Sequence, residues 1–369
     1  MTTLLRKMTA LFFLVALSAH AGAQSADWQK TWDTTLAAAK KEGKVVIIGS
    51  PDPVMRKEII PKFTERFGIP VEFIAGSSSQ LAGRVRTERA SGIFAVDVYM
   101  SNVGTTINTL YAEKMIDPLK PLLLHPDVTD GRKWKRGKPW FVDKEDQYVL
   151  MLFSTVENFI FVNTDYVKPE EIRAANDLLN PKWLGKISTE DPREGGGSGI
   201  ASAIHFYTQL GPEFTKKLYV DQKPAMNRDR RQITDWLARG TYPICLTCRA
   251  DDALMLQKEG FKLVGIYEFS DMMNRVKVSP FVLTVANKAP HPNAATVFIN
   301  WMASKEAMEI YSRDNGVATL RNDVDESFLD PRTVPRPDVK YVDDTDADWV
   351  ASGRIEAGNK VRELLKRRE

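Results

Sequence analysis

The sequence predicts an α/β protein made of two lobes joined by a hinge, with a ligand cleft between them. Short β-branched strands alternate with amphipathic helices along most of the chain, a rhythm that is typical of parallel βαβ units. The chain has 369 residues, which is more than one ordinary hydrophobic core needs. A late strand also belongs with the first strands, so the chain is expected to leave the first lobe and return to it.

The N-terminal segment has the pattern of a secretory signal peptide. Arg6 and Lys7 precede an apolar run at 11–19, and small residues follow it. A positive start, a short apolar core and an Ala-x-Ala end are the marks of such a peptide, and the run is too short to span a bilayer permanently. We expect cleavage after Ala23, with Ala21 as the alternative, and export of the mature protein.

The charge balance indicates no nucleic-acid partner. The chain carries 51 Lys and Arg against 48 Asp and Glu, a net charge of +3. The one local basic cluster, at 132–138, lies among glycine and proline, as expected of a solvated loop.

In the first lobe, strands and helices are expected in alternation, separated by Gly, Ser and Pro. The expected strands are 44–48, 71–75 and 95–100, and the expected helices are 32–41, 54–67, 80–90 and 105–114.

A polar segment at 120–147 precedes the passage into the second lobe. Strands 149–153 and 158–162 are expected on either side of a connection at 154–157, and the glycine run 195–199 is expected to open a helix at 200–210. The strand 280–285 is assigned to the first lobe. The expected division is 24–154 plus 278–322 for lobe 1, 155–277 for lobe 2, and 323–369 for a helical tail packing on the lobes.

Small polar residues follow several of the expected strands. In open α/β sheets, ligands bind beyond the carboxyl ends of the strands, and the N–H groups at a helix start favour an anionic oxygen. We therefore expect ligand contacts from Ser50, Asp52, Ser77, Ser78, Ser79, Ser101, Asn102, Gly196, Gly197 and Ser198.

Two arginines and one acid complete the expected site. Arg249 follows the strand 242–246, and Arg230 precedes a helix at 232–239. A guanidinium can hold a carboxylate or phosphonate with two parallel hydrogen bonds. Glu157 lies in the expected hinge as a ligand contact or a bridge between lobes.

The only cysteines, Cys245 and Cys248, are spaced C-x-x-C. A structural disulfide or two free thiols are favoured over redox chemistry, because the preceding segment reads as strand and not as the start of a helix. Two thiolates without a nearby histidine make a poor zinc site.

The order of several motifs resembles the periplasmic substrate-binding proteins of ABC importers, in the iron-type branch with the two-lobed type II fold. The matching segments are VEFIAGSSSQ (71–80), VDVYMSN (96–102), NFIFVNTD (158–165), PKWLGKI (181–187) and HPNAATVFINWMASKE (291–306). The resemblance implies hinge closure on a small solute and delivery to a membrane permease, with no catalysis. Together with the signal peptide, we expect a periplasmic monomer that contacts an inner-membrane permease transiently and holds no cofactor or metal.

One departure from this family concerns the ligand. Ferric-binding members carry two adjacent tyrosines after the strand that corresponds to 242–246, whereas this chain has Thr247, Cys248 and Arg249. Phenolates suit ferric iron and a guanidinium repels it. We therefore expect a small organic anion, a carboxylate or a phosphonate, with ferric iron in a site without the tyrosine pair as the alternative.

Two other classes of protein remain open. A hydrolase would need a nucleophile elbow, but Ile200 stands where Ser198 would need a glycine two residues later. His205, inside the helix after the glycine run, is interpreted as packing or capping. A receptor that reports to a membrane sensor would have the same sequence features as a transport protein.

Overall fold

The computed structural model describes residues 28–193, 197–278 and 280–366. The predicted signal peptide at residues 1–23 lies outside them. The chain divides into two compact units: unit 1 is Met1–Phe153 with Pro280–Phe328, and unit 2 is Ser154–Ser279 with Leu329–Glu369. None of the described helices has the length and apolar character needed to cross a bilayer.

Unit 1 is built on a mixed sheet. Within the described residues its strand order is β2-β1-β3-β14-β6-β5, with β4 paired to β14. Strand β1 pairs in parallel with β2 and β3, and β14 runs antiparallel to β3. All five residues of β1 are buried, as expected of a strand covered on both faces. The strands are β1 (Val45–Gly49), β2 (Val71–Ala75), β3 (Val98–Ser101), β4 (Ile116–Asp117), β5 (Trp140–Phe141), β6 (Leu150–Met151) and β14 (Val282–Ala286).

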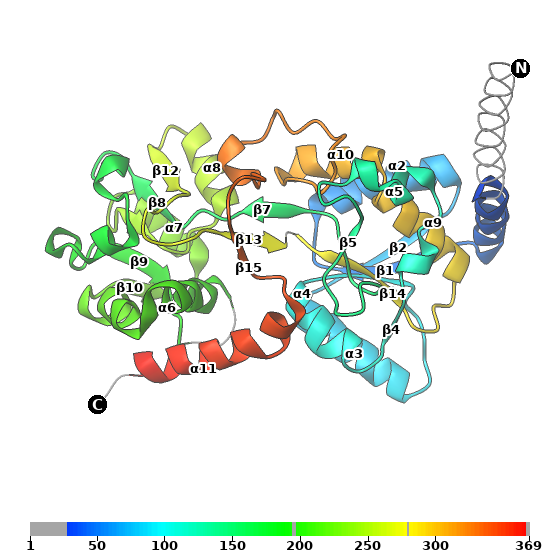
Figure 1. The fold of residues 1–369 in the computed structure, drawn as a ribbon, viewed down its shortest axis with the longest axis horizontal. Coiled ribbons are helices and arrows are strands. Elements are labelled where there is room, and N and C mark those ends of the chain that lie inside the picture. The colour runs from blue at the N-terminus through cyan, green and yellow to red at the C-terminus, as the bar shows by residue number, and fades with distance from the viewer. Residues whose placement is uncertain (1–27, 194–196, 279, 367–369) are drawn as a thin grey trace, which may run out of the picture. The chain divides into compact units, whose positions relative to one another are not determined.

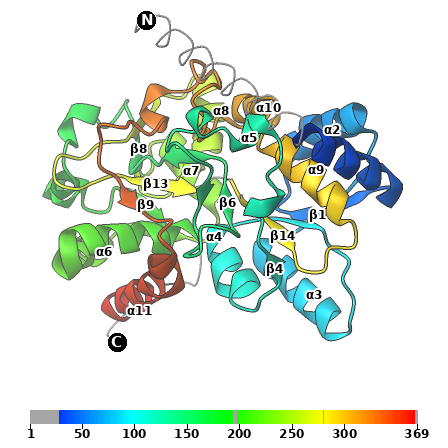
Figure 2. The same ribbon diagram turned by 45° about the vertical axis from the view of Figure 1, so that its right-hand side comes forward.

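Helices pack against this sheet around an aromatic core. Phe63 lies edge-on to Phe298, and helix α9 packs beside β1 (Figures 1 and 2). Pro61 is accommodated at the start of α2 because a wider π-helical turn precedes it, and α2 ends at Gly68 in the left-handed region. The helices are 28–42, α2 (Ile60–Phe67), α3 (Ser78–Ala90), α4 (Val103–Thr105), α5 (Pro126–Thr129), α9 (Pro292–Met302) and α10 (Lys305–Asn315).

Unit 2 contains two sheets among the described residues, in the orders β10-β9-β11-β8-β12 and β15-β13-β7. The expectation that 154–157 is only a connection between strands is wrong. Ser154–Val156 forms strand β7, which pairs with β13. The pairing is between segments far apart in the chain, so local sequence carries little signal for it. The strands are β7 (Ser154–Val156), β8 (Ile160–Asn163), β9 (Ile187–Glu190), β10 (Ala225–Asn227), β11 (Ile244–Cys245), β12 (Leu263–Ile266), β13 (Arg275–Val278) and β15 (Val342–Asp343).

The helices of unit 2 include the end of the chain. Helix α11 runs beside α6 (Figure 1), and its buried Ala357, Val361 and Leu365 join the same hydrophobic cluster as Ile200. The α6 segment extends beyond the expected end at 210, with a non-helical break at Gly211 (φ 85°). The helices are α6 (Ser198–Lys216), α7 (Arg230–Ala238), α8 (Ala250–Lys258) and α11 (Arg354–Leu365).

Short helical turns connect the remaining elements. Turns of 3₁₀ helix lie at Lys120–Leu122, Gly131–Lys133, Pro169–Glu171, Ala175–Leu179, Pro181–Trp183 and Pro331–Thr333, and π-helical turns at Met55–Ile59, Thr106–Tyr111, Lys217–Asp221 and Trp349–Gly353.

Candidate functional site

Unit 2 contains a small polar pocket at the carboxyl end of β11. Its volume is about 40 Å³, enough for a few water-sized groups, so it would take a compact part of a ligand and not a whole solute. Its lining comes from the β7–β8 connection, α6, the start of α7 and the segments beside β11 and β13: Glu157, Asn158, Phe159, Ser198, Ser202, His205, Phe206, Arg230, Leu246, Thr247, Cys248, Asn274 and Arg275.

Three residues predicted from sequence are brought together here, namely Glu157, Ser198 and Arg230. Arg249 is not among the lining residues. It stands at the N-cap position of α8, with its side chain 43% exposed and its Nε 3.3 Å from the Asp252 carboxylate. Gly196 lies outside the described residues.

Arg230 is held beside the pocket by the main chain. Its Nε donates to the carbonyl oxygen of Thr247 at 3.1 Å, and Asp229 caps the helix that it begins. The Thr247 hydroxyl in turn accepts the N–H of Glu190 at 2.6 Å. These bonds tie the start of α7 to the ends of β9 and β11, so the guanidinium stands on a fixed support.

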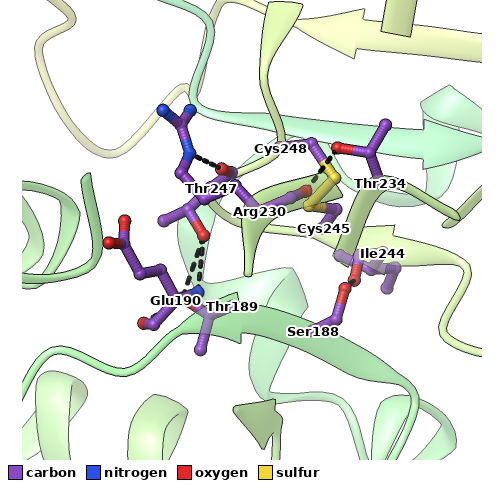
Figure 3. The surroundings of a disulfide bond; sticks show 9 residues. All are labelled: Ser188, Thr189, Glu190, Arg230, Thr234, Ile244, Cys245, Thr247 and Cys248. Carbon is purple, nitrogen blue, oxygen red and sulfur yellow. Dashed lines mark hydrogen bonds between the residues drawn. A yellow bond between two sulfur atoms is a disulfide. The ribbon is translucent and has the colours of Figure 1, made fainter. Parts of the chain in front are cut away.

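The two cysteines, which flank the segment containing Thr247, form a disulfide. Cys245 at the end of β11 is bonded to Cys248, and Thr247 lies between them in sequence (Figure 3). Both side chains are buried against Ile233 and Leu237 of α7. Of the alternatives that the sequence left open, the structure has the disulfide.

The start of α6 already holds a carboxylate. Glu190 Oε2 accepts the main-chain N–H groups of Ser198 at 2.8 Å and of Gly199 at 3.0 Å. Gly197 precedes them with φ 94°, a conformation that suits glycine. The main-chain donors on which the expected anion site depended are thus bonded to an acid of the chain itself, whereas the Ser198 side chain lines the pocket.

Glu157 is paired with a buried arginine. Arg275 Nη2 contacts the Glu157 carboxylate, and Nη1 donates to the Ala201 carbonyl at 3.1 Å and lies 3.5 Å from Asp344. Desolvation lowers the pKa of Arg275, but the two carboxylates outweigh it and the net pKa is raised. Burial raises the pKa of Asp344, against the opposing effect of Arg275.

His205 also lines the pocket, and its ring packs on Phe159, as its interpretation as a packing residue expects. Ser198, Ser202 and His205 are spaced i, i+4 and i+7, so they lie on one face of α6. This spacing is the signal in the sequence that could have placed His205 beside Ser198 on the pocket side of the helix. Desolvation, followed by the charge of Arg275, lowers the pKa of His205 to about 3, so its imidazole is neutral at physiological pH.

In unit 1, the predicted polar residues gather at one edge of the sheet. Ser50 and Asp52 follow β1, Ser77 to Ser79 follow β2, and Ser101 to Asn102 end β3. Because these three strands are adjacent and parallel, their carboxyl ends share that edge.

Several of these residues also serve the fold. The Asp52 carboxylate accepts the N–H of Val54 at 2.8 Å and the hydroxyl of Tyr311. Burial, and then Asp52, raise the pKa of Tyr311. Ser77 caps α3 in a capping box with Gln80.

The other polar residues at this edge differ in their contacts. Asn102 caps α4 and donates its N–H to Ser78 Oγ at 3.3 Å. Ser50 and Ser79 are exposed. Ser101 is 8% exposed, and its hydroxyl has no hydrogen-bond partner among the described residues.

The described part of the chain contains no group of three or more His, Cys, Asp and Glu side chains placed to hold a metal ion.

Comparison with known proteins gives a consistent picture. The family model for bacterial extracellular solute-binding proteins matches residues 44–316. Iron uptake protein A1 of Synechocystis is 23% identical over 268 residues, 70% of each chain.

Solved structures resemble the whole fold at low identity. The Trichodesmium protein IdiA (FutA), in complex with iron and citrate, is 17% identical with a TM-score of 0.62, covering 88% of this chain and 99% of that one. AfuA of Actinobacillus pleuropneumoniae, with fructose-6-phosphate bound, is 16% identical with a TM-score of 0.63, covering 88% of this chain and 98% of that one. These likenesses confirm the predicted fold class, an α/β fold of the two-lobed periplasmic binding type.

Proposed function

The chain belongs to the bacterial extracellular solute-binding proteins, and from this premise we propose that it binds a small organic anion, a carboxylate or a phosphonate, for an ABC importer. The observation that carries the proposal is Arg230, whose guanidinium lines the pocket and is supported by Thr247. A fixed guanidinium beside a hydroxyl such as that of Ser198 suits an anionic oxygen, because the anion loses water on entering and needs charged donors in its place.

The residues around the disulfide support an anion over a metal cation. Where ferric-binding members of the resembled family carry adjacent tyrosines, this chain has Thr247, Cys248 and Arg249, and the Cys248 sulfur is bonded to Cys245. A disulfide sulfur cannot act as a thiolate ligand, so these positions offer a cation neither the phenolates of the ferric-binding members nor a thiolate.

Ferric iron is the second candidate. It is favoured by the iron uptake protein and by the solved complex with iron and citrate among the similar proteins. The same complex also contains an organic anion, and AfuA was solved with a sugar phosphate, so the group of similar proteins spans both chemistries.

The proposal also includes closure on the solute, delivery to a permease and a monomeric state. A solute that contacts both units would bind the closed form better and shift the population toward it, and the loaded protein would dock transiently on a permease in the inner membrane. We propose a periplasmic monomer that performs no chemistry on its solute. Small-angle scattering with and without solute tests closure, and size-exclusion chromatography tests the monomer.

A thermal-shift screen of residues 24–369 tests the ligand. Binding to the native state alone raises the melting temperature by mass action. The panel holds small carboxylates, phosphonates, phosphates, sulfonates, polyols and ferric citrate, and hits are measured by calorimetry. Ferric ion is also added with the weak chelator nitrilotriacetate, so that iron and citrate are separated.

Matched arginine variants identify the residue that binds. Arg231 is exposed and lies next to Arg230, so Arg231→Gln is the control for Arg230→Gln. We expect an organic anion to lose at least tenfold in affinity in Arg230→Gln, as for a lost charge-assisted bond, and to keep it in Arg231→Gln. Arg249→Ala measures the contribution of the other predicted arginine. Binding of ferric ion without any anion dependence would favour the second candidate.

A further inference from the structure

The pocket of unit 2 contains a buried histidine whose second ring nitrogen has no partner. His205 is 5% exposed and lines the pocket, and its Nε2 has no hydrogen-bond partner among the described residues. Its ring stacks on Phe159, with centroids 5.7 Å apart and an interplanar angle of 17°. Buried polar atoms are rarely left unpaired, so this nitrogen is a candidate contact for a ligand.

The hydrogen bond made by the other ring nitrogen, Nδ1, decides whether Nε2 is a donor or an acceptor. A hydrogen bond between the imidazole and the main chain at Met273 raises the pKa of His205, which identifies the main-chain group as the carbonyl oxygen, because only an acceptor favours the protonated ring. Since Nε2 has no partner, the donor is Nδ1–H. The neutral ring therefore has a lone pair at Nε2, and the pocket exposes an acceptor.

Two of the donors that line the pocket are engaged elsewhere. Arg275 bonds Glu157 and the Ala201 carbonyl, and the side-chain amide of Asn274 donates to Tyr267 and accepts from Arg275. Nε2 of His205 is thus open to a donor on a molecule that enters the pocket. Arg230 lines the same small cavity, so both side chains border the space that a compact part of a ligand would occupy.

We propose that the solute is a hydroxylated organic anion, whose anionic group contacts Arg230 and whose neighbouring hydroxyl donates a hydrogen bond to Nε2 of His205. The proposal rests on the proposed function and narrows it to hydroxycarboxylates and polyol phosphates. Simple dicarboxylates and alkyl phosphates leave the nitrogen unpaired, and a site built to bond a hydroxyl rejects the analogue that lacks it.

Pairs of ligands that differ by their hydroxyl groups test the proposal. We would measure malate against succinate, citrate against tricarballylate, and glycerol 3-phosphate against propyl phosphate by calorimetry on the mature protein. The expected result is at least one pair in which the hydroxylated member binds about tenfold or more tightly. The carboxylate and phosphate pairs also separate the two anion classes.

The variant His205→Phe tests whether the preference for hydroxylated ligands depends on Nε2 of His205. Phenylalanine keeps a ring against Phe159 and removes the acceptor. We expect the preference to fall to about twofold or less, with the deoxy member unchanged. Tyr207→Phe, on another face of α6, is the control and should keep the preference. Melting temperatures of both variants check folding, and His205→Gln, which restores an acceptor, should recover part of the preference.

A spectroscopic readout is independent of the variants. The ¹⁵N shift of His205 Nε2 should move toward that of a hydrogen-bonded nitrogen with the hydroxylated ligand and not with its deoxy partner. Equal affinity within every pair, or a preference that survives in a folded His205→Phe, would overturn this inference alone. If no organic anion of either kind binds, the proposed function fails with it.

Discussion

The carboxylate of Glu190 accepts the main-chain N–H of Ser198 at 2.8 Å, so the start of helix α6 is capped from within the chain. The same oxygen accepts the N–H of Gly199 at 3.0 Å. A negative charge at this end also complements the helix dipole. The contact places the end of strand β9 against the start of the helix that carries Ser202 and His205 into the pocket.

Removing this cap should destabilise unit 2. We expect Glu190→Ala to lower the free energy of unfolding by about 1 kcal/mol, the usual cost of losing a cap, and Glu190→Gln to lower it less because its amide oxygen still accepts. Urea unfolding followed by circular dichroism measures both. Glu170→Ala removes an exposed acid from the same unit and is the control. Equal midpoints for all three variants would contradict the role of Glu190.

The disulfide should contribute to both stability and binding. Because Cys245 and Cys248 close a short loop, the chain-entropy model gives about 2 kcal/mol of stabilisation. Their bond also holds Thr247, whose carbonyl supports Arg230. We expect Cys245→Ala/Cys248→Ala to be less stable and to bind its anion several-fold more weakly.

Comparison of oxidised and reduced wild-type protein controls for the packing that alanine removes, since both forms keep the two sulfur atoms. Thiol titration under denaturing conditions would establish the redox state of each sample. Identical unfolding midpoints for the two forms would show that the bond has no structural role.

Local signals predicted much of the fold. The strand Val71–Ala75 is observed with the expected bounds, and Ser77 forms a capping box at the start of the helix that follows it. Such features depend on a few neighbouring residues, whose propensities and hydrogen bonds act over one turn. Strand β7 could not be predicted in this way, because its pairing with β13 depends on contacts between distant segments.

The site shows the same division. Strand order brings the predicted polar residues of unit 1 to one edge of its sheet, and Arg230 and Ser198 line the pocket of unit 2. The carboxylate of Glu190 at the helix start was missed, because the contact joins the end of β9 to the start of α6 and no local pattern in the sequence signals it. His205 was detectable only as a spacing on one helix face, and spacing alone does not tell packing from a ligand contact.

A buried arginine, Arg321, should be essential to the stability of unit 1. Arg321 is fully buried, donates to the carbonyls of Asp127 and Ala303 at 2.9 and 3.0 Å, and pairs with the Asp127 and Asp323 carboxylates. Arg321→Met would leave both acids and both carbonyls without this partner. We expect a loss of about 3–5 kcal/mol in the free energy of unfolding.

Arg313→Met is the matched control for this arginine. Arg313 pairs with Glu309 and is 57% exposed, so its loss should cost less than about 1 kcal/mol. Denaturant titration monitored by tryptophan fluorescence gives both values. A similar cost for the two variants would contradict the structural importance of the buried ion pairs.

The carboxylate of Asp323, which pairs with Arg321, makes the stability of unit 1 depend on pH. Hydrogen bonds from Arg321 hold the pKa of Asp323 below its ordinary value of 3.8. Because the folded carboxyl binds its proton less tightly than the unfolded one, its stabilising effect is complete above pH 3.8 and is lost as the pH falls toward the lower, folded pKa. Asp323→Asn should therefore be less stable than wild type at pH 7, and the difference should shrink as the pH falls below about 4. Urea unfolding across this range, with the exposed Asp314→Asn in the same unit as control, measures the effect. A difference between wild type and Asp323→Asn that stays constant with pH would mean that Arg321 does not stabilise the ionised form of Asp323.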